Sequence, residues 1–262
     1  NEAYLDSLVA LHAAFWEHPV LSEPALGLGD LKTFMDSSHP ELCAREADDF
    51  ILAQAMVEDV LTVLTDHPEI TQVTLVSDDP GANLLASNYG VDCWSEHSLG
   101  VRGLNALIER ASAKLLAVVD EPLLVLHGDL PLLTGESITR ALACQRALNG
   151  LVVGCDRHVS GTNLLAFERT SVPQFCFGVD SSARHLASAR SSGVPAQVLQ
   201  DSGIALDVDE PHDLAAFMSS PDTEDSGHTS ALLRATGLGA RIQLALATLF
   251  DSDEPADKGK LS

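Results

Sequence analysis

An aspartate follows one of the most apolar runs in the chain. Residues 123–133 read LLVLHGDLPLL, so five residues suited to a buried parallel strand lead into Gly128 and Asp129 before Pro131 stops the extended run. In open α/β sheets ligands bind at the carboxyl ends of the strands, which is where Asp129 would lie. Asp129 is therefore a candidate site residue, and the alternative is an aspartate that only opens a turn before a proline.

A second acidic group follows another short apolar run. Residues 204–213 read IALDVDEPHD, and Asp207 and Asp209 would point the same way because side chains alternate along a strand. Two carboxylates that face a third, Asp129, repel one another unless a cation lies between them, and oxygen ligands of this kind suit Mg²⁺. The pattern thus predicts a magnesium site of Asp129 with at least one of Asp207 and Asp209, although Asp209 could also cap the helix that Pro211 begins.

Small and hydroxyl side chains lead into a third apolar run, residues 158–167, HVSGTNLLAF. The small residues at 160–161 let a ligand approach main-chain N–H groups, and the Thr162 hydroxyl can bond a phosphate or carboxylate oxygen. Taken alone, this motif is better explained as an ordinary turn.

A helix start rich in serine follows, in residues 177–185, FGVDSSARH. Gly178 precedes Ser181 and Ser182, either of which can cap a helix, and the free N–H groups of a helix start form an anion site. His185 would share the helix face of Ser181, because residues four apart are neighbours on a helix. Two interpretations of His185 stay open: a site residue, or a packed and partly buried histidine.

Two glycines and an arginine precede the next helix, in residues 100–107, GVRGLNAL. Such a loop can hold a base or a ribose, with Arg102 available to an α-phosphate or pyrophosphate and Asn105 close by. The motif is weak, and the chain contains neither a P-loop nor a strand-linked G-x-G-x-x-G. The loop is a candidate nucleotide site without a diagnostic signature.

Strand-like and helix-like segments alternate between residues 49 and 219 and would position these motifs. The alternation predicts βαβ units, and hence one α/β domain over residues 1–219 with a mostly parallel sheet. No strand is expected in residues 1–40, and residues 220–262 are expected to form a polar linker, a helical segment at 229–250 and an acidic tail. The expected strands are residues 72–77, 123–127, 151–155, 163–167 and 204–207, and the expected helices are residues 49–64, 104–115, 134–148, 181–191 and 210–218.

The chain has 38 acidic and 15 basic residues, a formal charge of −23. Nucleic acid and anionic lipid would be repelled over much of such a surface, so neither is expected as a partner. An anionic small substrate stays compatible, because a bound divalent metal reverses the field locally. We see no apolar stretch of about 18 residues, no export signal and no metal or redox spacing among the five cysteines, so a soluble cytoplasmic protein is expected.

Four motifs, HGDLPLL, SGTNLLAF, FGVDSSARHLASA and IALDVDEPHDL, stand in the order and approximate spacing of one enzyme family. Over residues 49–219 the chain resembles the 2-phospho-L-lactate guanylyltransferases, whose members also use phosphoenolpyruvate or 3-phospho-D-glycerate in making coenzyme F420. The resemblance implies a single-domain nucleotidyltransferase fold, with a central mixed sheet flanked by helices. It also implies GTP and a small phosphorylated acid as substrates, pyrophosphate as a product and Mg²⁺ as the cofactor.

The resemblance can be carried over motif by motif. The family's magnesium ligands match Asp129, Asp207 and Asp209. Its pocket for the phosphorylated acid matches Thr162, Gly178 and Ser181. Its G-L-N stretch, on the nucleotide side, matches Gly103 and Asn105. The chain departs from the family near its start, where A-K-[ST]-R-L is replaced by residues 31–35, LKTFM, and Lys32 is left as the cation for the triphosphate.

By this interpretation an acceptor phosphate oxygen attacks the α-phosphorus of GTP, and positioning and electrostatic stabilisation dominate the catalysis. Two alternatives remain at this point. One is a catalytically silent, nucleotidyltransferase-like binding module, and the other is a molybdopterin or sugar-phosphate nucleotidyltransferase, whose usual G-G-x-x-x-R-[ML] loop is absent from this sequence. The sequence does not separate the three acids, and it leaves the oligomeric state open, a homodimer included.

Overall fold

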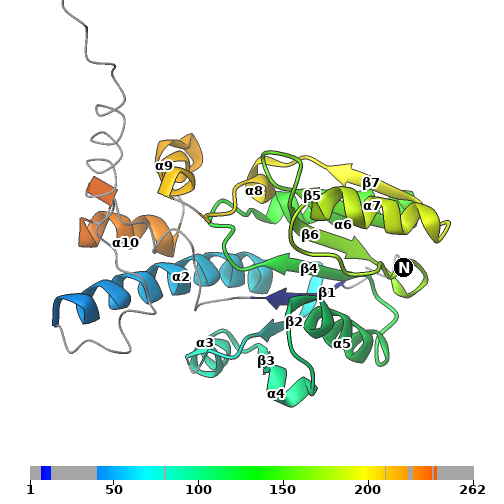
Figure 1. The fold of residues 1–262 in the computed structure, drawn as a ribbon, viewed down its shortest axis with the longest axis horizontal. Helices are drawn as coiled ribbons and strands as arrows, with labels where there is room; N and C mark the ends of the chain where they lie inside the picture. Colours follow the sequence, from blue (N-terminus) through cyan, green and yellow to red (C-terminus); the bar gives the residue numbers. More distant parts are fainter. Residues whose placement is uncertain are drawn as a thin grey trace, which may run out of the picture.

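The computed structural model describes residues 7–12, 40–79, 81–209, 211–223, 227–237 and 239–240. A seven-stranded sheet in the order β3-β2-β1-β4-β6-β5-β7 forms its centre (Figure 1). Among these strands only β6 runs antiparallel to its neighbours, so the sheet is mixed and mostly parallel, as predicted. The strands are β1 (Ser7–His12), β2 (Ile70–Val76), β3 (Asp92–Trp94), β4 (Leu123–His127), β5 (Leu151–Cys155), β6 (Thr162–Phe167) and β7 (Ala196–Leu199).

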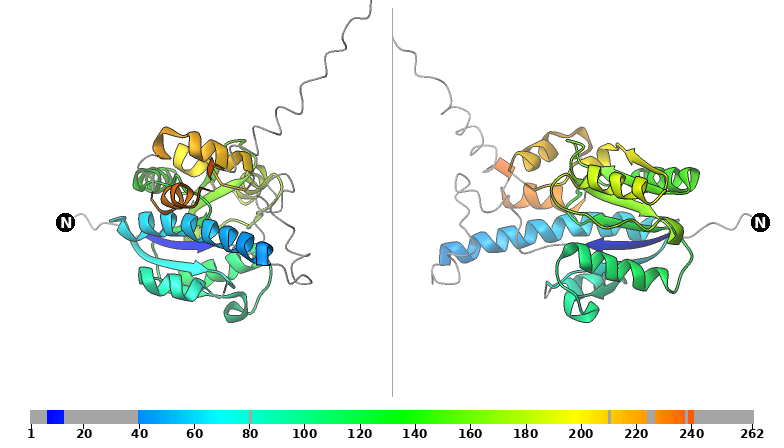
Figure 2. Two further views of the ribbon diagram at one scale, coloured as in Figure 1. Left: turned by 90° about the vertical axis from the view of Figure 1, so that its left-hand side faces the viewer. Right: turned by 45° about the vertical axis from the view of Figure 1, so that its right-hand side comes forward.

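Helices cover both faces of the sheet (Figure 2). Side chains of α2, α3 and α6 join one core cluster, side chains of α5 and α7 join a second on the opposite face, and α9 and α10 pack against α2. The described helices are α2 (Pro40–Asp66), α3 (Ala82–Tyr89), α4 (Glu96–Leu99), α5 (Leu104–Leu116), α6 (Gly135–Leu148), α7 (Ser181–Ser191), α8 (Ser202–Ala205), α9 (Pro211–Ser219) and α10 (His228–Thr236), with 3-10 turns η3 (Arg169–Ser171) and η4 (Pro221–Thr223).

The candidate site depends most on strand β4. Leu124 and Leu126 belong to the core cluster of α2 and α6, whereas Leu123 and Val125 belong to the cluster of α5. All four side chains are buried, and full burial of a leucine contributes roughly 2 kcal/mol. A strand that is buried on both faces shows no polar alternation, which explains the uninterrupted apolar run in the sequence.

Most elements expected from the sequence are present. The strands at residues 123–127 and 151–155 and the helix at 181–191 agree to the residue, and the other confirmed elements differ only at their ends, most of all α2, which begins at Pro40. The sequence prediction contains neither β3 nor β7. It is wrong for residues 1–40, where β1 pairs in parallel with both β2 and β4 at the centre of the sheet.

The strand expected at residues 204–207 is also wrong, because α8 occupies its first half. The Asp201 side chain accepts the Gly203 N–H at 3.0 Å and caps this short helix. Gly203 lies so close to α6 that a Cβ atom there would be 2.5 Å from Ser137 Oγ. The apolar run therefore starts as a capped helical turn, and the chain becomes extended only at Leu206.

The segment after α9 returns to the core. Asp59 of α2 accepts the main-chain N–H groups of His228 and Thr229, at 2.5 and 3.0 Å, and thus caps α10. α10 is the described part of the helix expected at 229–250, and residues 241–262 lie outside the described residues. The domain boundary at residue 219 stays a prediction. Among the helices described, none has the length and apolar character needed to cross a membrane.

Asp201 joins α8 to α6, and its replacement measures how much this link stabilises the fold. The buried carboxylate accepts hydrogen bonds from Ser137 Oγ at 2.6 Å, from Gly203 N at 3.0 Å and from Arg140 Nε at 2.5 Å. We expect Asp201→Ala to lower the free energy of unfolding in urea by about 3 kcal/mol, because buried donors lose their acceptor. Glu136→Ala is the control, since Glu136 pairs with the same Arg140 in solvent and its loss costs less than about 0.5 kcal/mol. Equal effects of the two changes would contradict this account.

Candidate active site

Asp129 lies directly after β4, at the carboxyl end where the sequence predicts it. Its main-chain carbonyl accepts the N–H of Val208 at 3.1 Å, so the segment after α8 runs beside it. Leu206 and Val208 are buried, whereas Asp207 is half-buried and Asp209 is exposed. Burial thus alternates along residues 206–209 as it would in a strand, although this segment is not a strand. Both aspartates lie on the side away from the core.

The three carboxyl groups lie close enough for the charge of Asp207 to raise the pKa of both Asp129 and Asp209. Burial, followed by the charge of Asp207, raises the pKa of Asp129 to about 7. Burial, Asp129 and Asp207 raise the pKa of Asp209 to about 7 as well, although solvent reaches Asp209 and screens part of the repulsion. Burial lowers the pKa of His127, against the opposing effect of Asp207 and Asp209. Perturbed carboxyl groups of this kind are typical of catalytic and metal-binding sites.

Carboxylate oxygens at this position fit Mg²⁺, which prefers hard oxygen ligands. Within the part of the chain that the structure describes, no group of three His, Cys, Asp or Glu side chains forms a ready metal cage. Mg²⁺ usually keeps several waters and takes part of its shell from substrate phosphates, so an incomplete protein shell agrees with its chemistry. The magnesium site stays a prediction, with Asp129, Asp207 and Asp209 as its donors.

An arginine compensates part of this negative charge. Arg157 forms an ion pair with Asp213 of α9, and the other Asp213 oxygen accepts the Asp209 N–H at 3.1 Å. The main-chain N–H of Arg157 donates to the Ala205 carbonyl at 2.8 Å. The segment that carries Asp207 and Asp209 is therefore held on both sides by polar contacts, which resist the separation of its carboxylates from Asp129.

Thr162, at the start of β6, meets the first turn of α7. Ser181 Oγ donates to Thr162 Oγ1 at 3.0 Å, and His185 Nδ1 lies 3.1 Å from the same oxygen. All three side chains are buried. The structure thus brings together two of the residues predicted for the acid pocket, and it places His185 on the helix face of Ser181, as expected.

Gly178 precedes α7 with a φ of 115°, a conformation that strains any residue with a side chain. The predicted helix cap is wrong: the N-cap is Asp180, which has a left-handed conformation, and Ser181 is already the first residue of the helix. The N–H groups of Ser181 and Ser182 donate to the carbonyls of Gly178 and Ser160, at 3.1 and 3.0 Å. These two N–H groups are therefore already used within the protein, and the buried hydroxyl groups become the better candidates for binding an anion.

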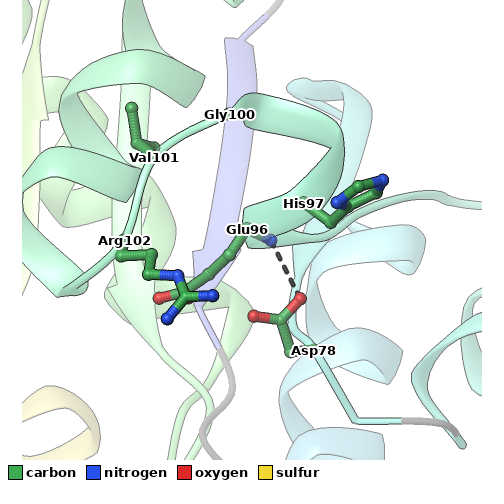
Figure 3. Close-up of a pocket in the computed structure, with 6 residues that line it drawn as sticks. All are labelled: Asp78, Glu96, His97, Gly100, Val101 and Arg102. Carbon is green, nitrogen blue, oxygen red and sulfur yellow. Dashed lines mark hydrogen bonds between the residues drawn. The ribbon is translucent and has the colours of Figure 1, made fainter.

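A pocket of about 390 Å³ lies beyond the ends of β2 and β3 (Figure 3). Asp78 Oδ1 accepts the N–H of Glu96, and Glu96 Oε1 accepts the N–H of Gly103, each at 2.9 Å. Figure 3 shows the Arg102 side chain directed toward the carboxylates of Glu96 and Asp78. Arg102 thus lines this pocket and Gly103 is hydrogen-bonded to Glu96 in its wall, whereas Lys32 lies outside the described residues. The other lining residues are His97, Gly100 and Val101.

Phe177 connects the three groups of candidate residues. Its N–H donates to Asn105 Oδ1 at 2.7 Å, and its carbonyl accepts from Asn105 Nδ2 at 3.2 Å. Its ring centroid lies 5.3 Å from that of His127 and 5.0 Å from that of His185. Asn105 therefore holds the loop before Gly178 in place, and its predicted contact with a nucleotide stays a prediction.

Sequence analysis missed several residues of this region. His127 and Asp213 carry a signal, since they lie two and four residues from the candidate aspartates Asp129 and Asp209. The contacts of Phe177, Glu96 and Asp78 join segments that are distant along the chain, and no local pattern shows them.

The family model described as guanylyl transferase CofC-like matches residues 37–243. The chain belongs to this family. It is accordingly an enzyme of the nucleotidyltransferase class, and the reaction type is guanylyl transfer. The match extends over the segments that carry Asp129, Thr162, Ser181, Asp207 and all other described candidate residues.

Named relatives agree with this assignment. A phosphoenolpyruvate guanylyltransferase of Sphaerobacter thermophilus is 32% identical over 182 residues, 69% of this chain and 86% of the relative. Another, of Mycolicibacterium paratuberculosis, is 35% identical over 184 residues, 68% of this chain and 77% of the relative.

Solved structures share the fold at low identity. One assigned as a nucleotide-diphospho-sugar transferase of Desulfovibrio desulfuricans has a TM-score of 0.66 at 18% identity, and covers 91% of this chain and 97% of its own. A nucleotidyl transferase of Methanothermobacter has a TM-score of 0.55 at 13% identity, and covers 89% of this chain and 100% of its own. These likenesses support the nucleotidyltransferase fold alone.

The raised pKa of Asp129 predicts a pH-dependent cost of folding in metal-free protein. The folded state keeps the proton up to about pH 7, whereas the unfolded chain releases it near its ordinary pKa of 3.8. The stability that the protonated group contributes is therefore lost as the pH rises from about 4 to about 7. In EDTA at pH 8 we expect Asp129→Asn to unfold with a free energy on the order of 2 to 4 kcal/mol higher than the parent, and with no difference at pH 4.

Thermal and urea unfolding at the two pH values measure this difference. Asp120→Asn is a matched control, because the Asp120 side chain is 92% exposed and lies before β4, at the opposite end of the strand. A parent protein as stable as Asp129→Asn at pH 8 would show that burial and the neighbouring carboxylates do not raise the pKa of Asp129 in the fold.

Proposed function

We propose that this guanylyltransferase transfers GMP from GTP to phosphoenolpyruvate and releases pyrophosphate, as a step toward coenzyme F420. The acceptor is inferred from relatives at 32 and 35% identity that are phosphoenolpyruvate guanylyltransferases. The observation that carries the proposal is the position of Phe177, which contacts His127 beside the acidic group, His185 beside the buried hydroxyls, and Asn105 at the start of α5. The proposed binding regions for the acid, the nucleotide and the metal would therefore all adjoin this loop.

The acidic group is proposed to bind Mg²⁺ through Asp129, Asp207 and Asp209. When bound, Mg²⁺ neutralises charge on the α-phosphate and on the departing pyrophosphate. The raised pKa of Asp129 supports this role, because a cation would allow the carboxyl group to ionise fully at neutral pH. The protein itself contributes position and fixed dipoles, and it needs no general base because the attacking phosphate is already ionised near pH 7.

The two substrates are proposed to bind on either side of the Phe177 loop. Thr162, Ser181 and the main chain at Gly178 would line the pocket for the phosphorylated acid, with the Thr162 hydroxyl, which accepts the Ser181 O–H, as an uncharged donor. Arg102, Gly103 and Asn105 would face the nucleotide, with Lys32 added for the triphosphate. A cytoplasmic location and a homodimer stay predictions.

The acceptor can be identified directly. Incubation with GTP, Mg²⁺ and one acid at a time should yield the diphosphate-linked product with phosphoenolpyruvate, and less than about a tenth as much with 2-phospho-L-lactate or 3-phospho-D-glycerate. The planar C2 of phosphoenolpyruvate is tetrahedral in both competitors, with a methyl group beside it in the first and a free hydroxyl on it in the second, and either change alters the fit. Mass spectrometry of the products gives the answer. A preference for either competitor would overturn the acceptor and retain the guanylyltransferase, whereas no product from any acid would overturn the proposed function.

Asp129→Asn should lower kcat about a hundredfold or more, because it removes a charged oxygen ligand from the proposed metal site. The variant should stay folded by circular dichroism. Asp120→Asn, which changes an exposed carboxylate at the other end of β4, should retain normal turnover. Pyrophosphate release by Asp129→Asn at near-normal rates would remove Asp129 from the proposed metal site.

A further inference from the structure

The contacts of His185 decide which of its ring nitrogens carries a proton. His185 has no exposed surface, and its Nε2 lies 2.9 Å from the main-chain nitrogen of Cys176. A main-chain amide can only donate, so Nε2 must accept and must carry no hydrogen. The proton of the neutral ring therefore lies on Nδ1.

The surroundings keep the ring neutral and fix its orientation. Burial, with a smaller effect of Arg184, lowers the pKa of His185 to about 4, so the imidazole is uncharged at physiological pH. The ring also packs edge-on against Phe177, at 5.0 Å between centroids and 72° between planes. With Nε2 occupied and the ring held in place, Nδ1–H faces Thr162 Oγ1 and the main-chain carbonyl of Ser181, one turn earlier in α7.

Thr162 Oγ1 receives two hydrogen bonds in this arrangement. His185 Nδ1–H donates to it over 3.1 Å, and Ser181 Oγ donates to it over 3.0 Å. A hydroxyl oxygen has two acceptor positions, and both are then filled. The Thr162 hydrogen must consequently be donated to a further acceptor, and no hydrogen bond among the described residues uses it.

We propose that His185 is a positioning residue, which fixes the buried Thr162 hydroxyl as a donor to an anionic oxygen of the phosphorylated acid. The inference rests on the proposed function, because that function supplies the anionic acceptor. Thr162 is only 4% exposed and opens β6 beside the Phe177 loop, so an isolated hydroxyl there would be free to rotate. His185 and Ser181 remove that freedom before the substrate arrives.

Two variants of His185 separate positioning from packing. His185→Gln places an amide oxygen near the former Nε2, so it keeps the acceptor for Cys176 and loses the donor to Thr162. His185→Asn places an amide nitrogen near the former Nδ1, so it keeps the donor to Thr162 and loses the acceptor for Cys176. We expect His185→Gln to raise the KM for phosphoenolpyruvate about tenfold with the KM for GTP unchanged, and His185→Asn to raise it less than about threefold.

Thr162→Val completes a double-mutant cycle with His185→Gln. If His185 acts through Thr162, the two changes together should raise the KM for the acid no further than Thr162→Val alone. Effects that multiply, or equal effects of Gln and Asn at position 185, would overturn the proposal and leave the guanylyltransferase intact. Absence of product with wild-type protein and every acid would instead show that the proposed function fails, and the inference with it.

The tautomer can be observed without turnover. In protein labelled with ¹⁵N-histidine, the ring signals assigned to His185 by comparison with His185→Asn should show a protonated Nδ1 and an unprotonated Nε2 from pH 8 down to about pH 5. A protonated Nε2 would overturn the proposal, whatever the kinetic result.

Discussion

Repulsion between like charges at the carboxyl end of β4 is the constraint on which the structure depends. Burial and then the charge of Asp207 raise the pKa of Asp129, so the fold must hold the two carboxyl groups near one another against the cost of ionising both. On one side of the acidic group, the buried strand β4 fixes the position of Asp129. The Val208 hydrogen bond to the Asp129 carbonyl and the Asp201 cap of α8 fix the other side. These contacts keep the acidic side chains near one another, as the proposed magnesium site requires.

The Phe177 loop places other groups against that acidic region. Asn105 binds both main-chain groups of Phe177, so two hydrogen bonds link the start of α5 to the loop before α7. The Phe177 ring then lies between His127 and His185. A bulky apolar side chain between the acidic group and the buried hydroxyls excludes water, which strengthens the electrostatic interactions on both sides.

Sequence patterns predicted the elements that are defined by local chemistry and missed those defined by distant partners. β4 and β5 are buried on both faces, so their apolar runs are distinctive. β1 is a central strand as well, but it is flanked by segments of similar composition, and its partners lie roughly 60 and 115 residues away in β2 and β4. The run at 204–207 was misassigned because an Asp201 side chain decides between a helical turn and a strand. The pair of Thr162 and Ser181 followed from a family resemblance, whereas the direction of its hydrogen bonds follows only from the contact between His185 and Cys176.

An acidic enzyme with two anionic substrates can bind them with cations or with neutral donors. Two guanidinium groups of the chain are already paired with buried carboxylates, Arg157 with Asp213 beside Asp209 and Arg140 with Asp201 before α8. A guanidinium paired in this way has less charge and fewer donors left for a phosphate. Buried hydroxyl groups carry no charge, so they form no ion pairs with neighbouring carboxylates. The direction of their O–H bonds can be set by other neutral groups. At the proposed acid site the polarity would thus come from oriented dipoles and a bound cation, and this arrangement would reconcile a net charge of −23 with the binding of phosphates.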